Sequence, residues 1–180
     1  SGIWRRFEIK GEYKNALIVS DYAHHPTAVK ATIEAARQFY HGKRIFAIFQ
    51  PHQHNRTKKL YKDFLNSFND ADVVILSEIF DVAGREESDD QNVSSLDLVN
   101  DIKKNNCWLH SSDRAVEPIA QKGSTALKGL WNQRANSIFY AKDLKETRKL
   151  IDANIKPDDI LLIMGAGDIH KVVDELVNKK

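Results

Sequence analysis

This sequence lacks long hydrophobic runs and an excess of either charge, and it has almost no cysteine. The single cysteine, Cys107, excludes an intramolecular disulfide and a cysteine-rich zinc site, and it fits a reducing, cytoplasmic setting. The 27 basic and 25 acidic residues give a net charge of +2, which disfavours a dedicated nucleic-acid-binding module. Runs such as Ile160–Met164 are too short to cross a bilayer, so we expect no membrane insertion.

The chain does have enough apolar surface for a core. Of its 180 residues, 42% are hydrophobic and 9% aromatic, which is typical of folded domains and argues against intrinsic disorder. We expect residues 1–180 to form one domain, with Ser1-Gly2 as a remnant of cloning or a domain cut. Residues 111–136 fit neither a helical nor a strand pattern, and we interpret them as a surface insertion.

Strands are predicted where short, unbroken apolar runs rich in β-branched residues occur. Four runs fit a buried strand: Ala16–Val19, Ile45–Phe49, Val73–Leu76 and Ile160–Met164. Three weaker runs are Ser137–Tyr140, Cys107–Leu109 and Trp4–Ile9. The last of these suits an edge strand, because charged residues interrupt it.

Amphipathic helices are predicted between these strands, because apolar residues recur there at helical spacing. The stripes are Val29, Ile33, Ala36 and Tyr40; Leu60, Tyr61, Phe64, Leu65 and Phe68; Leu98, Val99 and Ile102; Thr147 and Leu150; and Ile169, Val172, Val173, Leu176 and Val177. Pro26 suits the first turn of the first helix. Ser94 or Ser95 can cap the third helix, and Asp143 can cap the fourth.

Strand–helix alternation with unbroken apolar strands predicts an α/β, Rossmann-like domain, in which helices cover both faces of a mostly parallel sheet. Sheets of this kind bind ligands at the carboxyl ends of their strands, in the loops that lead into helices. These loops are therefore the place to search for a functional site.

The loop after the first buried strand has the sequence D-Y-A-H-H-P over residues 21–26. It joins a strand end to a helix N-terminus, where free backbone N–H groups favour an anion. Asp21 can accept hydrogen bonds from sugar hydroxyls, and Tyr22 can stack on a base. The alternative is structural, with Asp21 and His25 capping the helix and Tyr22 packing against the core.

The loop after the second buried strand has the sequence Q-P-H-Q-H-N-R-T over residues 50–57. Arg56 would lie at the start of the next helix, and its planar guanidinium matches a carboxylate or phosphate through two parallel hydrogen bonds. His52 can donate to the same ligand or exchange a proton with it. A solvated polar loop is the alternative. We favour binding, because the first two loops would be neighbours in a parallel sheet.

The loop after the last strand contains Gly165 and Gly167, followed by Asp168. The glycines allow a tight turn with close backbone approach, which serves either a ligand or the strand–helix connection itself. This G-x-G is not the dinucleotide-binding fingerprint, because the third glycine is replaced by His170. We therefore give this loop only a contributing role in the site.

Taken in this order, the loops at 21–27, 49–57 and 165–169 resemble those of the C-terminal domain of the Mur ligases, the ATP-dependent enzymes that build the peptide of bacterial peptidoglycan. Residues 5–8, R-R-F-E, resemble the junction that follows the central domain of that family. D-Y-x-H-x-P marks the broader superfamily, whereas F-Q-P-H followed by an arginine resembles the branch that adds L-alanine to UDP-N-acetylmuramate. The resemblance covers nearly the whole chain apart from 111–136.

The resemblance implies that the full enzyme phosphorylates the lactyl carboxylate of UDP-N-acetylmuramate, and that the amine of L-alanine attacks the acyl phosphate. It implies that Asp21 binds the ATP ribose and that Tyr22 lies near the nucleotide or the alanine. It further implies that His24, His52 and Arg56 hold the alanine and the reacting phosphate, with His24 and Arg56 as the catalytic residues. ATP and Mg²⁺ would be bound mainly by the central domain, and an N-terminal domain would bind the sugar nucleotide.

Two departures qualify what the resemblance implies. In the alanine-adding branch the residue after F-Q-P-H is usually arginine, whereas this chain has Gln53, so Arg56 carries more of the expected carboxylate site. The chain also has no G-x-x-x-x-G-K-[ST] loop to hold ATP phosphates. We therefore expect an excised domain of a bacterial cytoplasmic enzyme, which folds but does not catalyse ligation by itself.

Three alternatives stay open. A related ligase that attaches a recycled tripeptide to the same sugar nucleotide shares D-x-A-H-H-P, but it usually has F-E-P in the second loop. The chain also suits a non-catalytic α/β module that binds a nucleotide or an acidic metabolite. A zinc-dependent hydrolase would use His24, His25, His52 and His54, but no familiar ligand spacing completes that set, so we predict no metal ion in this chain.

Overall fold

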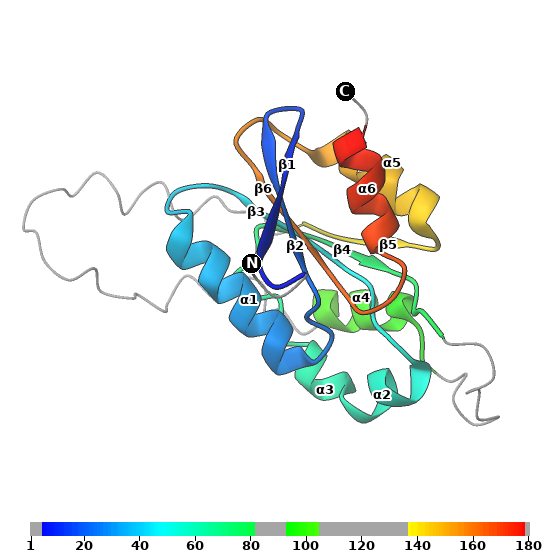
Figure 1. Ribbon diagram of the computed structural model, residues 1–180. Helices are drawn as coiled ribbons and strands as arrows, with labels where there is room; N and C mark the ends of the chain where they lie inside the picture. The colour runs from blue at the N-terminus through cyan, green and yellow to red at the C-terminus, as the bar shows by residue number, and fades with distance from the viewer. Residues whose placement is uncertain (1–4, 82–92, 105–136, 179–180) are drawn as a thin grey trace, which may run out of the picture.

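The computed structural model describes residues 5–81, 93–104 and 137–178, which form a six-stranded sheet with helices on both faces (Figure 1). The strands are β1 (Glu8–Tyr13), β2 (Ala16–Asp21), β3 (Ile45–Phe49), β4 (Val73–Ser77), β5 (Ser137–Ala141) and β6 (Ile160–Met164). The helices are α1 (Pro26–Phe39), α2 (His54–Lys59), α3 (Tyr61–Phe64), α4 (Ser95–Lys104), α5 (Leu144–Asn154) and α6 (His170–Asn178). The predicted α/β class with a mostly parallel sheet is confirmed.

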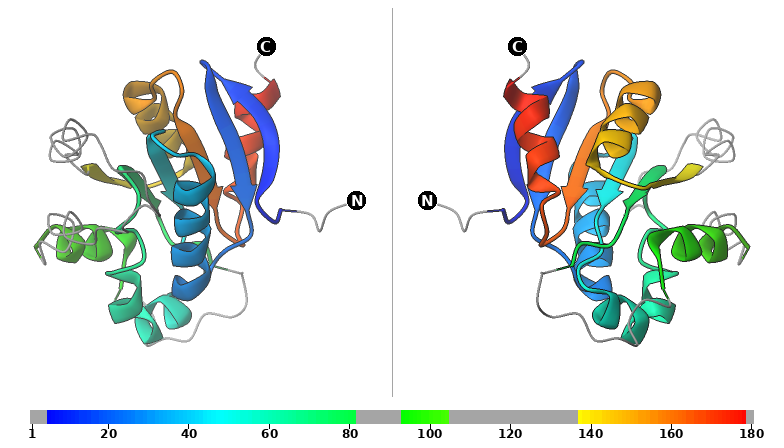
Figure 2. Two further views of the ribbon diagram at one scale, coloured as in Figure 1. Left: turned by 90° about the vertical axis from the view of Figure 1, so that its left-hand side faces the viewer. Right: turned by 90° about the vertical axis from the view of Figure 1, so that its right-hand side faces the viewer.

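The sheet has the strand order β1-β2-β6-β3-β4-β5. β2, β6, β3, β4 and β5 run parallel, and the central strand β6 pairs with both β2 and β3. β1 is antiparallel to β2, and a tight turn at Lys14 and Asn15, with φ of 49° and 62°, joins the two strands. A turn with two positive φ angles matches the twist of a hairpin. Figure 2 shows β1 beside α6 at one edge of the molecule and α4 at the other.

Alternate residues of each parallel strand enter two separate cores, because successive side chains of a strand point to opposite faces. One core joins Val19, Ala47, Phe49, Val74, Leu76 and Leu162 to α1, α3 and α4. The other joins Ile18, Phe46, Ile48, Ile75, Leu161 and Ile163 to α5 and α6. Figure 1 shows α1 and α6 on opposite sides of the strands. Burial on both faces explains why these strands are uninterrupted apolar runs.

The helix starts follow the predicted local signals. Pro26 is the first residue of α1, and the Nδ1 atom of His25 accepts a hydrogen bond from the N–H of Thr27 (3.4 Å). At α4, the Ser94 hydroxyl accepts from the N–H of Asp97 (3.1 Å), and the Asp97 carboxylate accepts from the N–H of Ser94 (2.9 Å). At α5, the Asp143 carboxylate accepts from the N–H of Glu146 (2.7 Å). Each cap satisfies a backbone donor that the helix itself leaves unpaired.

The predicted edge strand at Trp4–Ile9 is wrong in its position, because β1 begins only at Glu8. Arg5 and Phe7 have φ of 55° and 45°, so residues 5–7 are not extended. Instead of pairing as a strand, this segment folds back so that the carbonyl of Arg5 accepts from the N–H of Tyr22 (2.7 Å).

The single helix predicted over the stripe from Leu60 to Phe68 is also wrong. The chain forms the short helices α2 and α3 on either side of Leu60, and a series of turns follows α3. The rings of Phe64 and Phe68 lie 5.5 and 5.6 Å from the ring of Phe49, and tight turns bring both against it. The weak run Cys107–Leu109 and the surface insertion expected at 111–136 lie outside the described residues.

Candidate functional site

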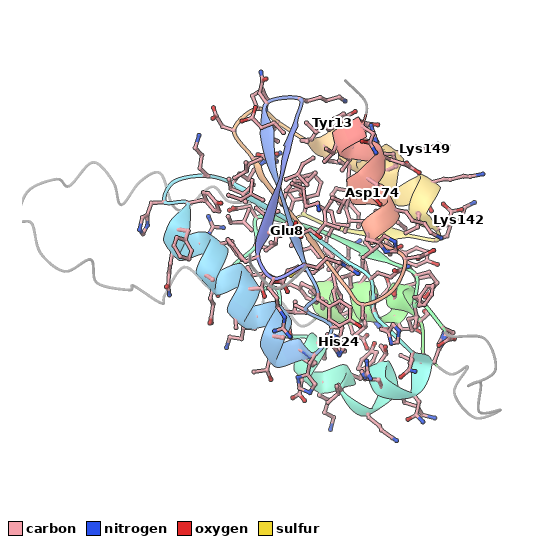
Figure 3. All side chains as sticks on the ribbon, in the orientation of Figure 1. Glu8, Tyr13, His24, Lys142, Lys149 and Asp174 are labelled. Carbon is pink, nitrogen blue, oxygen red and sulfur yellow. The ribbon has the colours of Figure 1, made fainter. Side chains whose placement is uncertain are left out.

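The carboxyl ends of β2, β6 and β3 are adjacent, and the loops that follow them meet along one edge of the sheet. The N–H of Gly165 donates to the carbonyl of Asp21 (3.2 Å), and the N–H of Gln50 donates to that of Met164 (3.2 Å). We call this edge the rim, comprising Arg5 and residues 21–25, 50–57, 78–81 and 165–169. Figure 3 shows His24 at this end of the molecule, at the start of α1. The structure therefore brings the three predicted loops together.

Gln50 holds two of these loops together. Its Nε2 donates to Oδ1 of Asp168 (3.0 Å), and its Oε1 accepts from the N–H of Ile169 (3.0 Å). The side chain is buried. Because both ends of the amide are already bonded, Gln50 and Asp168 fix the shape of the rim.

The two glycines of the last loop are packed closely against other protein atoms, so neither has space for a side chain. A Cβ on Gly167 would lie 2.6 Å from Cγ of Phe80 and 2.7 Å from Oε1 of Gln50. Gly165 has a φ of 146°, and a Cβ there would lie 2.9 Å from the carbonyl oxygen of Gln50. These contacts support the interpretation that the G-x-G serves the strand–helix connection. A contact between its backbone and a ligand stays a prediction.

Asp21 is buried, and its carboxylate bonds to the backbone of two segments. Oδ2 accepts from the N–H of Phe7 (2.7 Å), and Oδ1 accepts from the N–H of Ala23 (2.7 Å). Asp21 therefore joins the chain before β1 to the first loop. A ribose would have to use the remaining lone pairs of these oxygens, and that role stays a prediction.

Arg5 is a residue of the rim that the candidate list from the sequence missed. Its side chain is buried, its Nη2 donates to the carbonyl of Gly165, and its guanidinium lies 5.2 Å from the ring centroid of Tyr22. Burial lowers the pKa of Arg5, and the neighbouring Tyr22 and Asp21 partly oppose this. The available signal was the R-R-F-E segment, which we treated only as a junction.

Four predicted side chains of the first two loops form a continuous group, which we call the rim cluster: Tyr22, His24, His52 and Arg56. The ring of Tyr22 meets the ring of His24 edge-on, with 5.3 Å between centroids. The ring of His24 lies 6.4 Å from that of His52. Nη1 of Arg56 lies 3.5 Å from Nδ1 of His52. The elements that position them are the ends of β2 and β3 and the start of α2.

The rim cluster is suited to an anion. Its members are neutral or basic, and Arg56 forms no ion pair within the described parts of the chain. Tyr22 is 39% exposed, so its ring is accessible beside the histidines. A guanidinium next to an imidazole can bind a carboxylate or phosphate through charge-assisted hydrogen bonds.

Metal chemistry finds no support in this group. Among residues 5–81, 93–104 and 137–178, no three histidine, cysteine, aspartate or glutamate side chains lie close enough to hold a metal ion. His25 caps α1, and His54 bonds to Asp81, so two of the four histidines of the zinc alternative have other partners. The same donor set does not fit Mg²⁺, which prefers several oxygen ligands.

Comparisons with known proteins agree with the motifs of these loops. The family model described as Mur ligase, glutamate ligase domain, matches residues 5–167. The chain is 37% identical over 172 residues to the UDP-N-acetylmuramate–L-alanine ligase of Persephonella marina, an alignment that covers 96% of this chain and 30% of that protein. The chain thus spans about a third of the length of the curated relatives it matches.

Two solved structures show the same fold. The UDP-N-acetylmuramate–alanine ligase of Thermotoga maritima matches with a TM-score of 0.60 and 22% identity, over 99% of this chain and 30% of that one. A murein peptide ligase of Psychrobacter arcticus matches with a TM-score of 0.60 and 20% identity, over 98% of this chain and 30% of that one.

No helix in the described ranges is long and apolar enough to span a membrane.

Proposed function

This chain belongs to the Mur ligase family, and on that premise we propose that it is the C-terminal domain of an ATP-dependent ligase that joins L-alanine to UDP-N-acetylmuramate. Its relatives with this printed activity are about three times longer than the chain. The proposal therefore concerns a longer protein, working in the bacterial cytoplasm, in which this domain supplies part of the amino-acid and nucleotide site.

The proposed reaction forms an amide in two steps. The lactyl carboxylate of the sugar nucleotide first takes the γ-phosphoryl group of ATP, which gives an acyl phosphate and ADP. The amine of L-alanine then attacks the acyl carbon, and the tetrahedral intermediate collapses as phosphate leaves. The amine loses a proton in this step, so the attack requires L-alanine to be held with its nitrogen deprotonated and close to the acyl carbon.

The observation that carries the proposal is the guanidinium of Arg56 beside the His52 ring at the rim, since Arg56 forms no ion pair with a carboxylate of the described residues. Arg56 binds the alanine carboxylate through its guanidinium, and His52 donates to the same carboxylate or to the phosphate. His24 lies on the other side of His52 and faces the reacting phosphate. Tyr22, with its accessible ring beside Asp21, forms the nucleotide side of the rim.

The remaining parts of the site belong to other domains of the proposed full enzyme. ATP and Mg²⁺ are bound mainly by the central domain, where Mg²⁺ neutralises phosphate charge during phosphoryl transfer. This chain contains no P-loop sequence of its own. The N-terminal domain binds the sugar nucleotide. We therefore expect the 180-residue chain to be inactive when it is assayed alone.

A phosphate-release assay with the full-length enzyme tests the proposal. We expect release that depends on ATP, UDP-N-acetylmuramate and L-alanine together. Release with the tripeptide L-alanyl-γ-D-glutamyl-meso-diaminopimelate instead of L-alanine would identify the tripeptide-adding alternative. Binding of a nucleotide without any release would favour the non-catalytic module, and release by the 180-residue chain alone would contradict the assignment of the P-loop to another domain.

Substitution of Arg56 tests the assignment of the amino-acid site. In the full-length enzyme, Arg56→Ala should raise the KM for L-alanine about 100-fold, because a charge-assisted pair worth roughly 2–3 kcal/mol is lost. The KM for UDP-N-acetylmuramate should change less than about twofold, because this residue does not contact the sugar nucleotide. Lys59→Ala, an exposed cation on the same helix, is the matched control and should leave both values unchanged. Unaltered alanine kinetics in Arg56→Ala would remove the amino-acid site from this loop.

A further inference from the structure

His54 and Asp81 form a two-point contact at the start of α2 that the proposed function leaves unused. Oδ1 of Asp81 accepts from the backbone N–H of His54 (3.1 Å), and Oδ2 contacts Nδ1 of the same residue. A carboxylate can only accept, so Nδ1 of His54 carries the proton that it donates. The two side chains are 23% and 33% exposed, so solvent reaches the pair only in part.

This contact continues a short parallel connection between the loops after β3 and β4. The N–H of Phe80 donates to the carbonyl of Pro51 (2.9 Å), and the N–H of Gln53 donates to the carbonyl of Phe80 (2.8 Å). The ring of His52 stacks on the ring of Phe80, with 5.7 Å between centroids. The second loop, which carries His52 and Arg56, is therefore bound along its length to Phe80 and Asp81.

These contacts surround a strained backbone conformation at Gln53. Gln53 has φ of 67° and ψ of 127°, a conformation that residues with a Cβ rarely adopt. Such a conformation persists only where the surrounding contacts enforce it. Gln53 lies directly between His52 and His54, so the pair with Asp81 fixes one side of the strained residue, and the Phe80 contacts fix the other.

We infer that His54 and Asp81 are positioning residues, which hold the start of α2 so that the His52 ring and the Arg56 guanidinium are preassembled for the carboxylate of the incoming amino acid. The inference rests on the proposed function for the identity of that ligand. Neither residue of the pair belongs to the rim cluster, and both act through the backbone that carries it. A preassembled site lowers the cost of ordering these side chains when the amino acid binds.

Two substitutions of His54 in the full-length enzyme separate this role from general stability. His54→Leu removes the donor to Asp81, and we expect the KM for L-alanine to rise about tenfold while the KM values for ATP and the sugar nucleotide stay within about twofold. His54→Asn keeps an N–H donor near the position of Nδ1, and it should restore the wild-type KM. His41→Leu, an exposed histidine just beyond the far end of α1, is the matched control.

Proton–carbon NMR of the histidine rings in the 180-residue chain tests the geometry without any assay of activity. His54→Leu should shift the ring signals of His52, and His41→Leu should not. Unshifted His52 signals, or an unchanged alanine KM in an active His54→Leu enzyme, would overturn the inference. Equal losses in His54→Leu and His54→Asn would also overturn it, because the donor would then be irrelevant. If the wild-type enzyme does not ligate L-alanine, the proposed function fails, and the NMR result alone decides whether the pair positions His52.

Discussion

The two ends of the parallel sheet use their charged side chains differently. At the amino end, where β3 and β6 begin, cations and carboxylates pair with each other, and Figure 3 labels Tyr13 there. At the rim, where His24 is labelled, the basic side chains of the rim cluster contact one another. Both ends are rich in polar residues in the sequence, so composition does not distinguish them.

The pairs at the amino end are built into the fold. Nε and Nη2 of Arg44 donate to the two carboxylate oxygens of Asp159 (2.8 and 2.7 Å), and Asp159 is buried. On α5, Asp152 accepts hydrogen bonds from the hydroxyl of Tyr13 (2.6 Å) and from Nε of Arg148 (3.0 Å). Removing one partner of such a pair leaves a buried charge uncompensated and destabilises the domain, and paired groups have little capacity for a ligand.

The rim differs from this end, although His54 and Asp81 also form a pair there. Its buried polar groups, Asp21 and Gln50, bond to backbone and hold the loops, whereas the outer groups, Arg56 and Tyr22, keep binding capacity. The difference predicts that substitutions at the amino end reduce stability, and that substitutions of the outer rim groups reduce ligand affinity. The predictions below test this contrast.

The largest expected effect on stability is at Asp159. Asp159→Ala leaves the Arg44 guanidinium and the N–H of Lys156 without their acceptor, and should lower the free energy of unfolding by roughly 3 kcal/mol. The adjacent Asp158 is the matched control, because its pair with Lys43 is exposed and Asp158→Asn should change stability by less than about 0.5 kcal/mol. Urea unfolding of the 180-residue chain measures both, and equal effects would contradict the contrast between buried and exposed pairs.

A smaller effect is expected at Asp152, and it depends on pH. Burial by itself raises the pKa of Asp152, but hydrogen bonds from Tyr13 and the two adjacent cations outweigh this and hold the pKa at about 2. The unfolded carboxyl titrates near 3.8, so the stabilisation is present above pH 4 and is lost as the pH falls toward 2. Because the side chain is more than a third exposed, screening by solvent reduces it to about 1 kcal/mol.

Unfolding of Asp152→Asn in urea at several pH values measures this contribution. At pH 7 the variant should be less stable than the wild type by about 1 kcal/mol, and most of the difference should be gone near pH 2, where about half of the folded wild-type carboxyl is protonated. A difference that is the same at both pH values would show that packing, rather than charge, accounts for the loss.

The smallest effect is expected at the rim. Gln53→Gly should raise the free energy of unfolding by about 0.5–1 kcal/mol, because glycine relieves the strained φ of this residue and its entropy cost cancels part of the gain. Gln53→Ala keeps the Cβ and the strain, so it should bring no gain. Thermal unfolding of the three chains compares them, and a loss of stability in Gln53→Gly would mean that the conformation is not strained.

The sequence predicted the strands well because burial on both faces leaves a local signature. Ile45–Phe49 and Ile160–Met164 have the predicted bounds, and β5 was found from the weaker run at Ser137–Tyr140. The capping residues of α4 and α5 were also predictable, because a cap bonds to backbone only a few residues away. The break at Leu60 was not, because it depends on packing against Phe49, which lies on another element.

The location of the candidate site was predictable from the sequence, but the contacts that each of its residues makes were not. The rule that ligands bind at the carboxyl ends of parallel strands identified all three loops. The positions of Arg5 and Asp81 in the rim were not predicted, because their partners Gly165 and His54 are distant in the chain. No periodicity encodes such a pair.

The sequence by itself determined the α/β class, the loops that carry the site and the family resemblance, since these follow from local hydrophobic pattern and short motifs. Only the tertiary structure decided that Asp21 and Gln50 hold loops together, while Tyr22, His24, His52 and Arg56 form one continuous group. The physical reason is that a polar side chain's role depends on which donors and acceptors the folded backbone brings within about 3 Å of it.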